Sequence, residues 1–74
     1  MRQEASARLG ERLRVLRRGR ALTQSALARL AGISRQYLSD IERGAVEPST
    51  ETASAIATAL GIRVEELSED TDCQ

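Results

Sequence analysis

Side chains that can hydrogen-bond to base edges are concentrated in one segment, residues 34 to 43, with the sequence SRQYLSDIER. If this segment is helical, a rotation of about 100° per residue turns Leu38 and Ile41 to one side. The opposite side is polar, is centred on Gln36 and Arg43, and includes Arg35, Ser39 and Asp40. Arginine can bind guanine O6 and N7 as a fork, and glutamine can bind adenine N6 and N7. The pattern is typical of a helix that reads the DNA major groove, although any solvated helix is also polar outside.

A capped helix precedes this segment. Thr23 is a good N-cap, and Leu22 and Leu27 have the spacing of a hydrophobic staple around it. We expect Leu27 and Leu30 to face inward. Gly32 can supply the positive φ with which many helices end.

The polar segment itself has its own start and stop signals. Ser34 can cap a helix over Arg35–Arg43, with Ile33 and Leu38 as its staple, and Gly44 ends it. Two capped helices joined by so short a glycine turn cross steeply, which is the geometry of a helix-turn-helix. Tyr37 falls between the buried and exposed sides, so its ring is structural or its hydroxyl or ring reaches a phosphate or a thymine methyl.

Further helices are expected on both sides of this unit. Leu9, Leu13 and Leu16 recur on one face and predict an amphipathic helix from about Ala5 to Arg18, ended by Gly19. Ser49 or Thr50 caps a fourth helix, closed by Gly61, whose narrow apolar stripe is Ala53, Ile56, Ala57 and Leu60. A short fifth helix covers Val64–Leu67. The predicted architecture is all-α with five helices over residues 1–67, followed by an acidic, disordered tail at 68–74.

Composition excludes several classes of function. The 74 residues make one small domain and contain no histidine, one cysteine (Cys73) and no glycine-rich phosphate loop. Zinc-finger spacing and histidine-based catalysis are therefore excluded, and we expect no enzyme activity, no metal and no cofactor. No apolar run is long enough for a membrane span and no signal peptide is visible, so we expect a cytoplasmic protein without a membrane partner.

The zero net charge hides two halves of opposite sign. Residues 1–44 contain ten arginines against four carboxylates, whereas residues 45–74 contain one arginine against seven carboxylates. This asymmetry is typical of a surface that meets phosphates and an acidic end kept away from them, or of a solvated surface of mixed sign.

From Leu9 through Leu67, the chain resembles the helix-turn-helix family of phage lambda repressor and Cro, the Xre-type regulators. The resemblance rests on the five-helix order and on the Thr-Gln, Ala-Gly, Ser-x-x-Tyr and Ile-Glu-Arg-Gly elements. It implies that Gln24 bonds a backbone phosphate and steadies the start of the recognition helix, and that Arg35 and Gln36 read bases. We expect DNA contacts from eight residues: Gln24, Ser34, Arg35, Gln36, Tyr37, Ser39, Asp40 and Arg43.

Two features bear on this resemblance. Asp40 repels phosphate, but it can accept from cytosine N4 or pair with Arg43 or Gln36. The loop 45–48 contains Val46 and Glu47 where many relatives have basic residues, so fewer phosphate contacts are expected there.

The resemblance also implies structural and dimer contacts. Glu42 turns partly inward and is expected to form a structural ion pair with Arg17. Ile62, Val64 and Leu67 resemble the family's dimer contacts, or they simply close the core.

The function predicted from the sequence is that of a sequence-specific transcriptional regulator. As a homodimer it would read a palindromic operator in double-stranded DNA through the major groove. No small-molecule ligand is evident, so regulation by protein concentration is expected, as in the small phage repressors and restriction-modification controller proteins that the chain resembles in size. The alternative is a protein-interaction module with the same fold, such as an antitoxin or a coactivator.

Overall fold

The computed structural model describes residues 2–67, with side chains from Arg8 onward, and this part of the chain is all-helical. Its five helices are α1 (Arg2–Gly19), α2 (Gln24–Ala31), α3 (Arg35–Glu42), α4 (Thr50–Leu60) and α5 (Val64–Leu67). The predicted fold class and helix order are confirmed, although α1 begins at Arg2 rather than near Ala5. The predicted tail at 68–74 lies outside the described residues.

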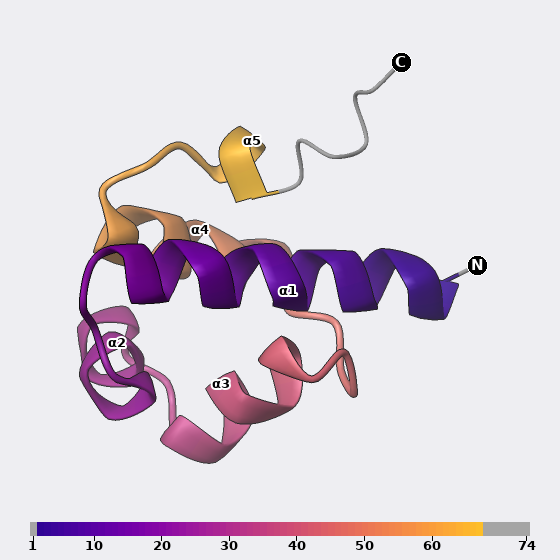
Figure 1. The fold of residues 1–74 in the computed structure, drawn as a ribbon, viewed down its shortest axis with the longest axis horizontal. Helices are drawn as coiled ribbons and strands as arrows, with labels where there is room; N and C mark the ends of the chain where they lie inside the picture. Colours follow the sequence, from indigo (N-terminus) through magenta and orange to yellow (C-terminus); the bar gives the residue numbers. More distant parts are fainter. Residues whose placement is uncertain (1, 68–74) are drawn as a thin grey trace.

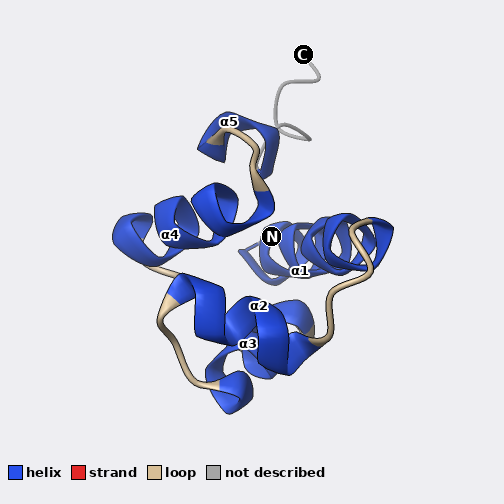
Figure 2. Ribbon diagram, turned by 90° about the vertical axis from the view of Figure 1, so that its left-hand side faces the viewer, coloured by secondary structure: helices blue, strands red, loops and turns tan. Residues whose placement is uncertain are grey.

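The helices enclose one small core. α2 packs on α4 and α3, α1 packs on α3 and α5, and α5 also packs on α4. Figures 1 and 2 show α1 running between the α2–α3 pair on one side and α5 on the other. The buried apolar residues come from all five helices and are Leu13, Leu27, Ala28, Leu38, Ile41, Ile56, Ala57, Leu60 and Leu67. The leucine stripe predicted for the first helix is present, since Leu9 and Leu16 pack against this core beside Leu13.

Hydroxyl side chains begin the three middle helices. The hydroxyl of Thr23 accepts from the Ala26 amide at 3.0 Å, and that of Ser34 accepts from the Tyr37 amide at 3.0 Å. Ser49, not Thr50, is the cap of α4, because its hydroxyl accepts from the Thr52 amide at 3.1 Å. These bonds satisfy amides that a helix start leaves unpaired, so they fix where each helix begins.

Four helices end in the same hydrogen-bonded turn, but only three of them use glycine for it. Gly32, Gly44 and Gly61 have φ of 75°, 78° and 76° after α2, α3 and α4. At the end of α1 the left-handed residue is Ala21, with φ 57°, and the Leu22 amide donates to the Arg17 carbonyl at 3.2 Å. The prediction that the first helix ends at Gly19 is confirmed, because Gly19 is its last helical residue. The chain turns two residues later because Leu22 must return to the core.

Exchanging the residues at this helix end is expected to stabilise the protein. Ala21→Gly removes the cost of about 1 kcal/mol that a Cβ incurs in the left-handed region. Gly19→Ala improves helix propensity by about 0.5 to 1 kcal/mol, and its Cβ would meet nothing within 4 Å. Urea denaturation of both single variants checks this. A loss of stability for Ala21→Gly would contradict the positive φ.

Leu30 does not face inward as predicted, because its side chain is 61% exposed. The buried side of α2 is formed by Leu27 and Ala28, with Ala31 partly buried beside them. The small alanines let α2 approach α4 and α3 closely, and this rotates Leu30 out of the interface. Residue polarity alone could not reveal this, since leucine is the more apolar residue.

Candidate nucleic-acid interface

The outer surface of α3 carries the polar residues that the sequence placed there. Leu38 and Ile41 are buried beneath it, with exposed fractions of at most 1%. We call the outer surface the reading face; Arg35, Gln36 and Arg43 are exposed and Ser39 and Asp40 half-buried on it. Tyr37 is partly buried against the core, as its position at the edge of the face predicted.

Asp40 joins two other members of the reading face. Its Oδ1 accepts a hydrogen bond from Gln36 Nε2 at 3.0 Å, and the same oxygen receives the guanidinium of Arg43 in an ion pair. These residues lie four before and three after Asp40, the separations at which helix side chains are neighbours. The sequence had left open whether Asp40 pairs or contacts a base, and in the structure it pairs with both neighbours.

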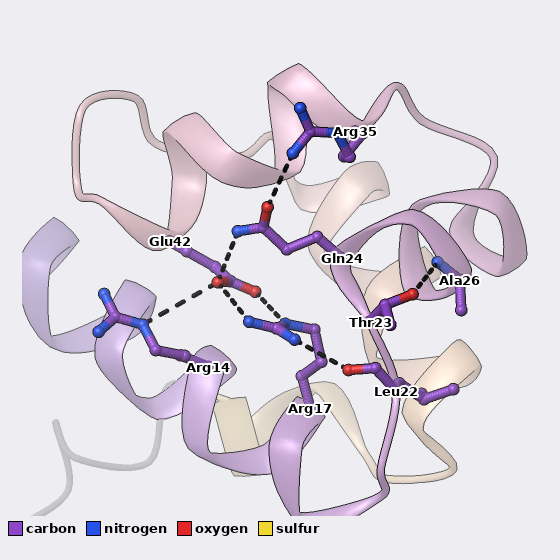
Figure 3. A network of polar contacts seen from close by, with 8 residues as sticks. All are labelled: Arg14, Arg17, Leu22, Thr23, Gln24, Ala26, Arg35 and Glu42. Atoms are coloured by element: carbon purple, nitrogen blue, oxygen red, sulfur yellow. Dashed lines mark hydrogen bonds and ion pairs between the residues drawn. The ribbon is translucent and has the colours of Figure 1, made fainter.

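An ion pair between α1 and α3 lies beneath the reading face (Figure 3). Arg17 Nε donates to Glu42 Oε2 at 2.7 Å, and Arg17 Nη2 donates to Glu42 Oε1 at 3.1 Å. Both residues are buried, with exposed fractions of 8% and 4%. The third nitrogen of the Arg17 guanidinium, Nη1, donates to the Leu22 carbonyl at 2.8 Å. Arg17 therefore fixes α3 and the α1–α2 loop to the same point of α1.

Gln24, the first residue of α2, links this ion pair to the reading face. Its Nε2 donates to Glu42 Oε1 at 3.0 Å, and its Oε1 accepts from Arg35 Nη1 at 3.3 Å (Figure 3). Because the carboxylate of Glu42 can only accept, the amide of Gln24 must turn its oxygen outward. The exposed guanidinium of Arg35 is thus hydrogen-bonded to the amide oxygen of Gln24, and the buried carboxylate of Glu42 holds that amide in place.

The pKa of Glu42 is lowered below its usual value, as the result of opposing effects. Burial raises it, but hydrogen bonds from Arg17 and Gln24 lower it, and so do the charges of Arg17 and Arg14. The lowering effects prevail. Arg14 contributes from α1, where its Nε lies 4.0 Å from Glu42 Oε1. The carboxylate therefore remains ionised at neutral pH.

This lowered pKa predicts an acid-sensitive fold. The contribution of ionised Glu42 to stability is complete above its usual pKa of 4.5. It is lost as the pH falls through the lower pKa of the folded state. We expect the difference in free energy of unfolding between the wild type and Glu42→Gln to shrink from pH 7 to pH 3 in urea denaturation. A constant difference would show that ionisation of Glu42 does not stabilise the fold.

Gly10 brings α1 into direct contact with the end of α3. It is buried, and a Cβ built on it would lie under 3.0 Å from the carbonyl oxygens of Ile41 and Glu42. Only glycine permits this approach, which places Arg17 within reach of Glu42. Gly10 was not among the residues predicted from the sequence to position the site. The available signal was a glycine next to Leu9 in an otherwise strong helix, since such glycines often have a packing reason.

The arginines outside α3 do not all belong to this surface. Arg20 Nε donates to the Leu60 carbonyl at 2.6 Å, so this side chain closes the end of α4. In the loop after α3, Val46 and Glu47 are exposed. The loop therefore exposes an apolar and an acidic side chain at positions where many relatives have basic residues.

The predicted dimer residues divide into two groups. Leu67 is 2% exposed within this chain and belongs to its core, which is the second of the two roles that the sequence left open for it. It is buried because α5 folds back on α1 and α4. Ile62 and Val64 pack against the core but are only partly buried. These two keep surface that a partner could reach.

The described part of the chain contains neither a membrane-spanning helix nor a cluster of metal ligands. No helix within residues 2–67 is long and apolar enough to cross a membrane. Among the side chains described, from Arg8 to Leu67, no three carboxylates come together as ligands for a metal ion would.

The fold and the site geometry can be compared with known proteins. A helix-turn-helix family model matches residues 13–67. The immunity repressor of Bacillus phage phi105 is 50% identical over 56 residues, which are 76% of this chain and 39% of that protein. The transcriptional regulator DdrOP3 of Deinococcus deserti is 46% identical over 65 residues, covering 88% of this chain and 50% of that protein. The chain thus spans half or less of these two curated relatives.

The chain spans nearly the full length of one similar protein whose structure has been solved. The restriction-modification controller protein C.AhdI of Aeromonas hydrophila aligns with a TM-score of 0.83 and 40% identity, over 84% of this chain and 94% of that one. The family match, the sequence relatives and this structure agree with the capped helix pair described above. The chain belongs to the helix-turn-helix family of Xre type.

Proposed function

We propose that the protein is a sequence-specific DNA-binding transcriptional regulator that places α3 in the major groove. The observation that carries the proposal is the reading face itself. It presents hydrogen-bonding side chains outward, while Leu38 and Ile41 anchor the helix and Gln24 and Glu42 support its first residue, Arg35. Such a support from packed elements holds base-reading groups in a fixed geometry.

The N-termini of α2 and α3 favour the binding of a DNA phosphate. Neither α2 nor α3 has an acidic residue in its first turn, so no side chain of those turns opposes the positive end of the helix dipole. The Nε2 group of Gln24 uses one N–H for Glu42 and keeps a second for a phosphate oxygen. Arg43, at the end of α3, is a further phosphate candidate. Phosphate contacts of this kind set the register of a recognition helix, whereas base contacts give the sequence preference.

The dimer is part of the same proposal. One recognition helix covers only a few base pairs, so regulators of this geometry read two half-sites about 34 to 36 Å apart as symmetric dimers. Ile62 and Val64 are the apolar candidates for the contact between copies, because they are only partly buried. Occupancy of a palindromic operator would then control transcription, in line with the repressor and regulator names of the relatives.

Selection of bound sequences from a random DNA pool, followed by titration against salt, tests the proposal. A symmetric motif whose affinity survives physiological salt supports it. Binding with no sequence preference that disappears by about 0.15 M salt would refute it, because electrostatic contacts alone behave in that way. Light scattering on the protein bound to its selected DNA measures whether two copies are present.

Replacing Arg35 with alanine is expected to weaken specific binding by about 1 to 3 kcal/mol and to relax one base position per half-site. The control is Arg18→Ala, which removes the same charge from an exposed position near the end of α1. Electrophoretic mobility shifts with single-base operator variants provide the measurement. An equal loss on all sequences would make Arg35 a phosphate contact instead of a base contact.

A further inference from the structure

Asp40 is the acidic member of the reading face, and one of its two carboxylate oxygens makes both of its contacts there. A single oxygen, Oδ1, accepts from both Gln36 Nε2 and the Arg43 guanidinium. The side chain is 28% exposed, so it reaches the surface that would face DNA. A negative charge at this place opposes phosphate, and its presence there needs a reason beyond helix stability.

We propose that Asp40 is a specificity-determining residue, which holds Gln36 and Arg43 in one hydrogen-bonded set and thereby limits what the reading face can bind. This inference rests on the proposed DNA-binding function. It identifies the chemistry that the face selects, which is a base with an exocyclic amino group in the major groove.

The orientation of Gln36 gives the first argument. Because Nε2 uses one of its two N–H groups for Asp40, the amide oxygen of Gln36 keeps both lone pairs for a ligand and is turned away from Asp40. This acceptor lies beside a carboxylate that can also only accept. Adenine N6 and cytosine N4 are the major-groove donors that suit two neighbouring acceptors, whereas thymine O4 and guanine O6 would face like partial charges. The pairing therefore favours adenine or cytosine over thymine or guanine at the same place.

The second argument is the restraint on Arg43. Its side chain is 59% exposed, yet its guanidinium is held by the ion pair with Asp40. A paired arginine neutralises less phosphate charge, so it contributes less to binding that ignores sequence. The exposed Glu47 in the following loop acts in the same direction. Affinity then depends more on base contacts, and wrong sites are bound less.

The test compares Asp40→Asn with Glu65→Gln, in the full chain and on the DNA selected by the wild type. Both changes replace a carboxylate by its amide, but Glu65 is exposed on α5. For Asp40→Asn, the salt slope should steepen by about 0.9 as Arg43 engages a phosphate, which is about 3.5-fold more affinity lost between 50 and 200 mM salt. Discrimination against thymine or guanine at one position per half-site should fall about tenfold. Asp40→Ala should change both quantities in the same direction, and thermal unfolding confirms that the variants are folded.

The outcomes separate this inference from the proposed function. If the wild type selects a sequence and the Asp40 variants keep its discrimination and salt slope, Asp40 does not determine specificity and the regulator proposal stands. Loss of binding to every DNA by folded Asp40 variants would also overturn the inference, since Asp40 would then support binding itself. If the wild type selects no sequence, the proposed function fails and the inference fails with it.

Discussion

Glu42→Ala is expected to lower the free energy of unfolding by about 3 to 5 kcal/mol, because it leaves the guanidinium of Arg17 buried without its carboxylate. Arg17 is only 8% exposed, so water cannot replace the lost partner. Domains of this size are stable by about 5 to 15 kcal/mol, and the variant should therefore be partly unfolded at 37 °C. Urea denaturation followed by circular dichroism measures the loss.

A double variant separates the ion pair from simple packing. Arg17→Met combined with Glu42→Leu replaces both charges by apolar groups of similar length, and such replacements of buried pairs are often neutral or stabilising. We expect it to recover at least half of the stability lost in Glu42→Ala. Full recovery is not expected, since the Leu22 carbonyl and the Gln24 amide each lose a partner. A Glu42→Ala loss below about 1 kcal/mol would show that the pair contributes little.

The loss should extend to DNA binding through Gln24. Without the Glu42 carboxylate, the amide of Gln24 is no longer obliged to turn its oxygen toward Arg35. The folded fraction of a Glu42 variant should therefore bind DNA more weakly than the wild type, and this is measured below its melting temperature. The effect should be greatest at the base that Arg35 contacts.

Gly10→Ala is expected to destabilise the protein by about 1 to 3 kcal/mol, the usual cost of overpacking a close contact. The added Cβ would push against the carbonyl oxygens of Ile41 and Glu42, which belong to backbone and cannot rotate away. In an unconstrained helix the same change would stabilise, because alanine is the better helix former by about 1 kcal/mol. The sign of the effect thus decides whether the contact is present.

Gly19→Ala is the matched control on the same helix, because its Cβ would meet nothing within 4 Å. Denaturation of both variants under one set of conditions should give opposite signs. Stabilisation by both changes would mean that α1 and α3 are not in close contact at Gly10. Destabilisation by Gly10→Ala alone would tie the position of α3, and with it the reading face, to this one glycine.

Much of the helix-turn-helix unit could be predicted from the sequence because its signals are local. The N-caps Thr23 and Ser34 and the terminal Gly32 act on amides and carbonyls within a few residues of themselves. The outward direction of Gln36 and Arg43 follows from helical rotation relative to Leu38, which is equally local. The family resemblance added the pairing of Arg17 with Glu42, which helical rotation alone does not give.

What the sequence left open or predicted wrongly depends on contacts distant in the chain. Leu30 is exposed because α2 turns its alanines toward α4, and Leu67 is buried because α5 folds back onto α1. The left-handed turn that follows α1 falls on Ala21 rather than on its terminal Gly19, and Leu22 beyond it packs on the core. In each case an apolar or glycine residue has several acceptable local positions, and packing selects one of them.

The sequence by itself determined the helices, their starts and the chemistry that α3 offers, since these depend on hydrogen bonds within one turn. Only the tertiary structure decided how that chemistry is held. Residues 25 apart form the Arg17–Glu42 pair, and residues 18 apart bring Gln24 to the same carboxylate. Such contacts require α1 to approach α3 at Gly10, and that approach is set by the packing of all five helices together.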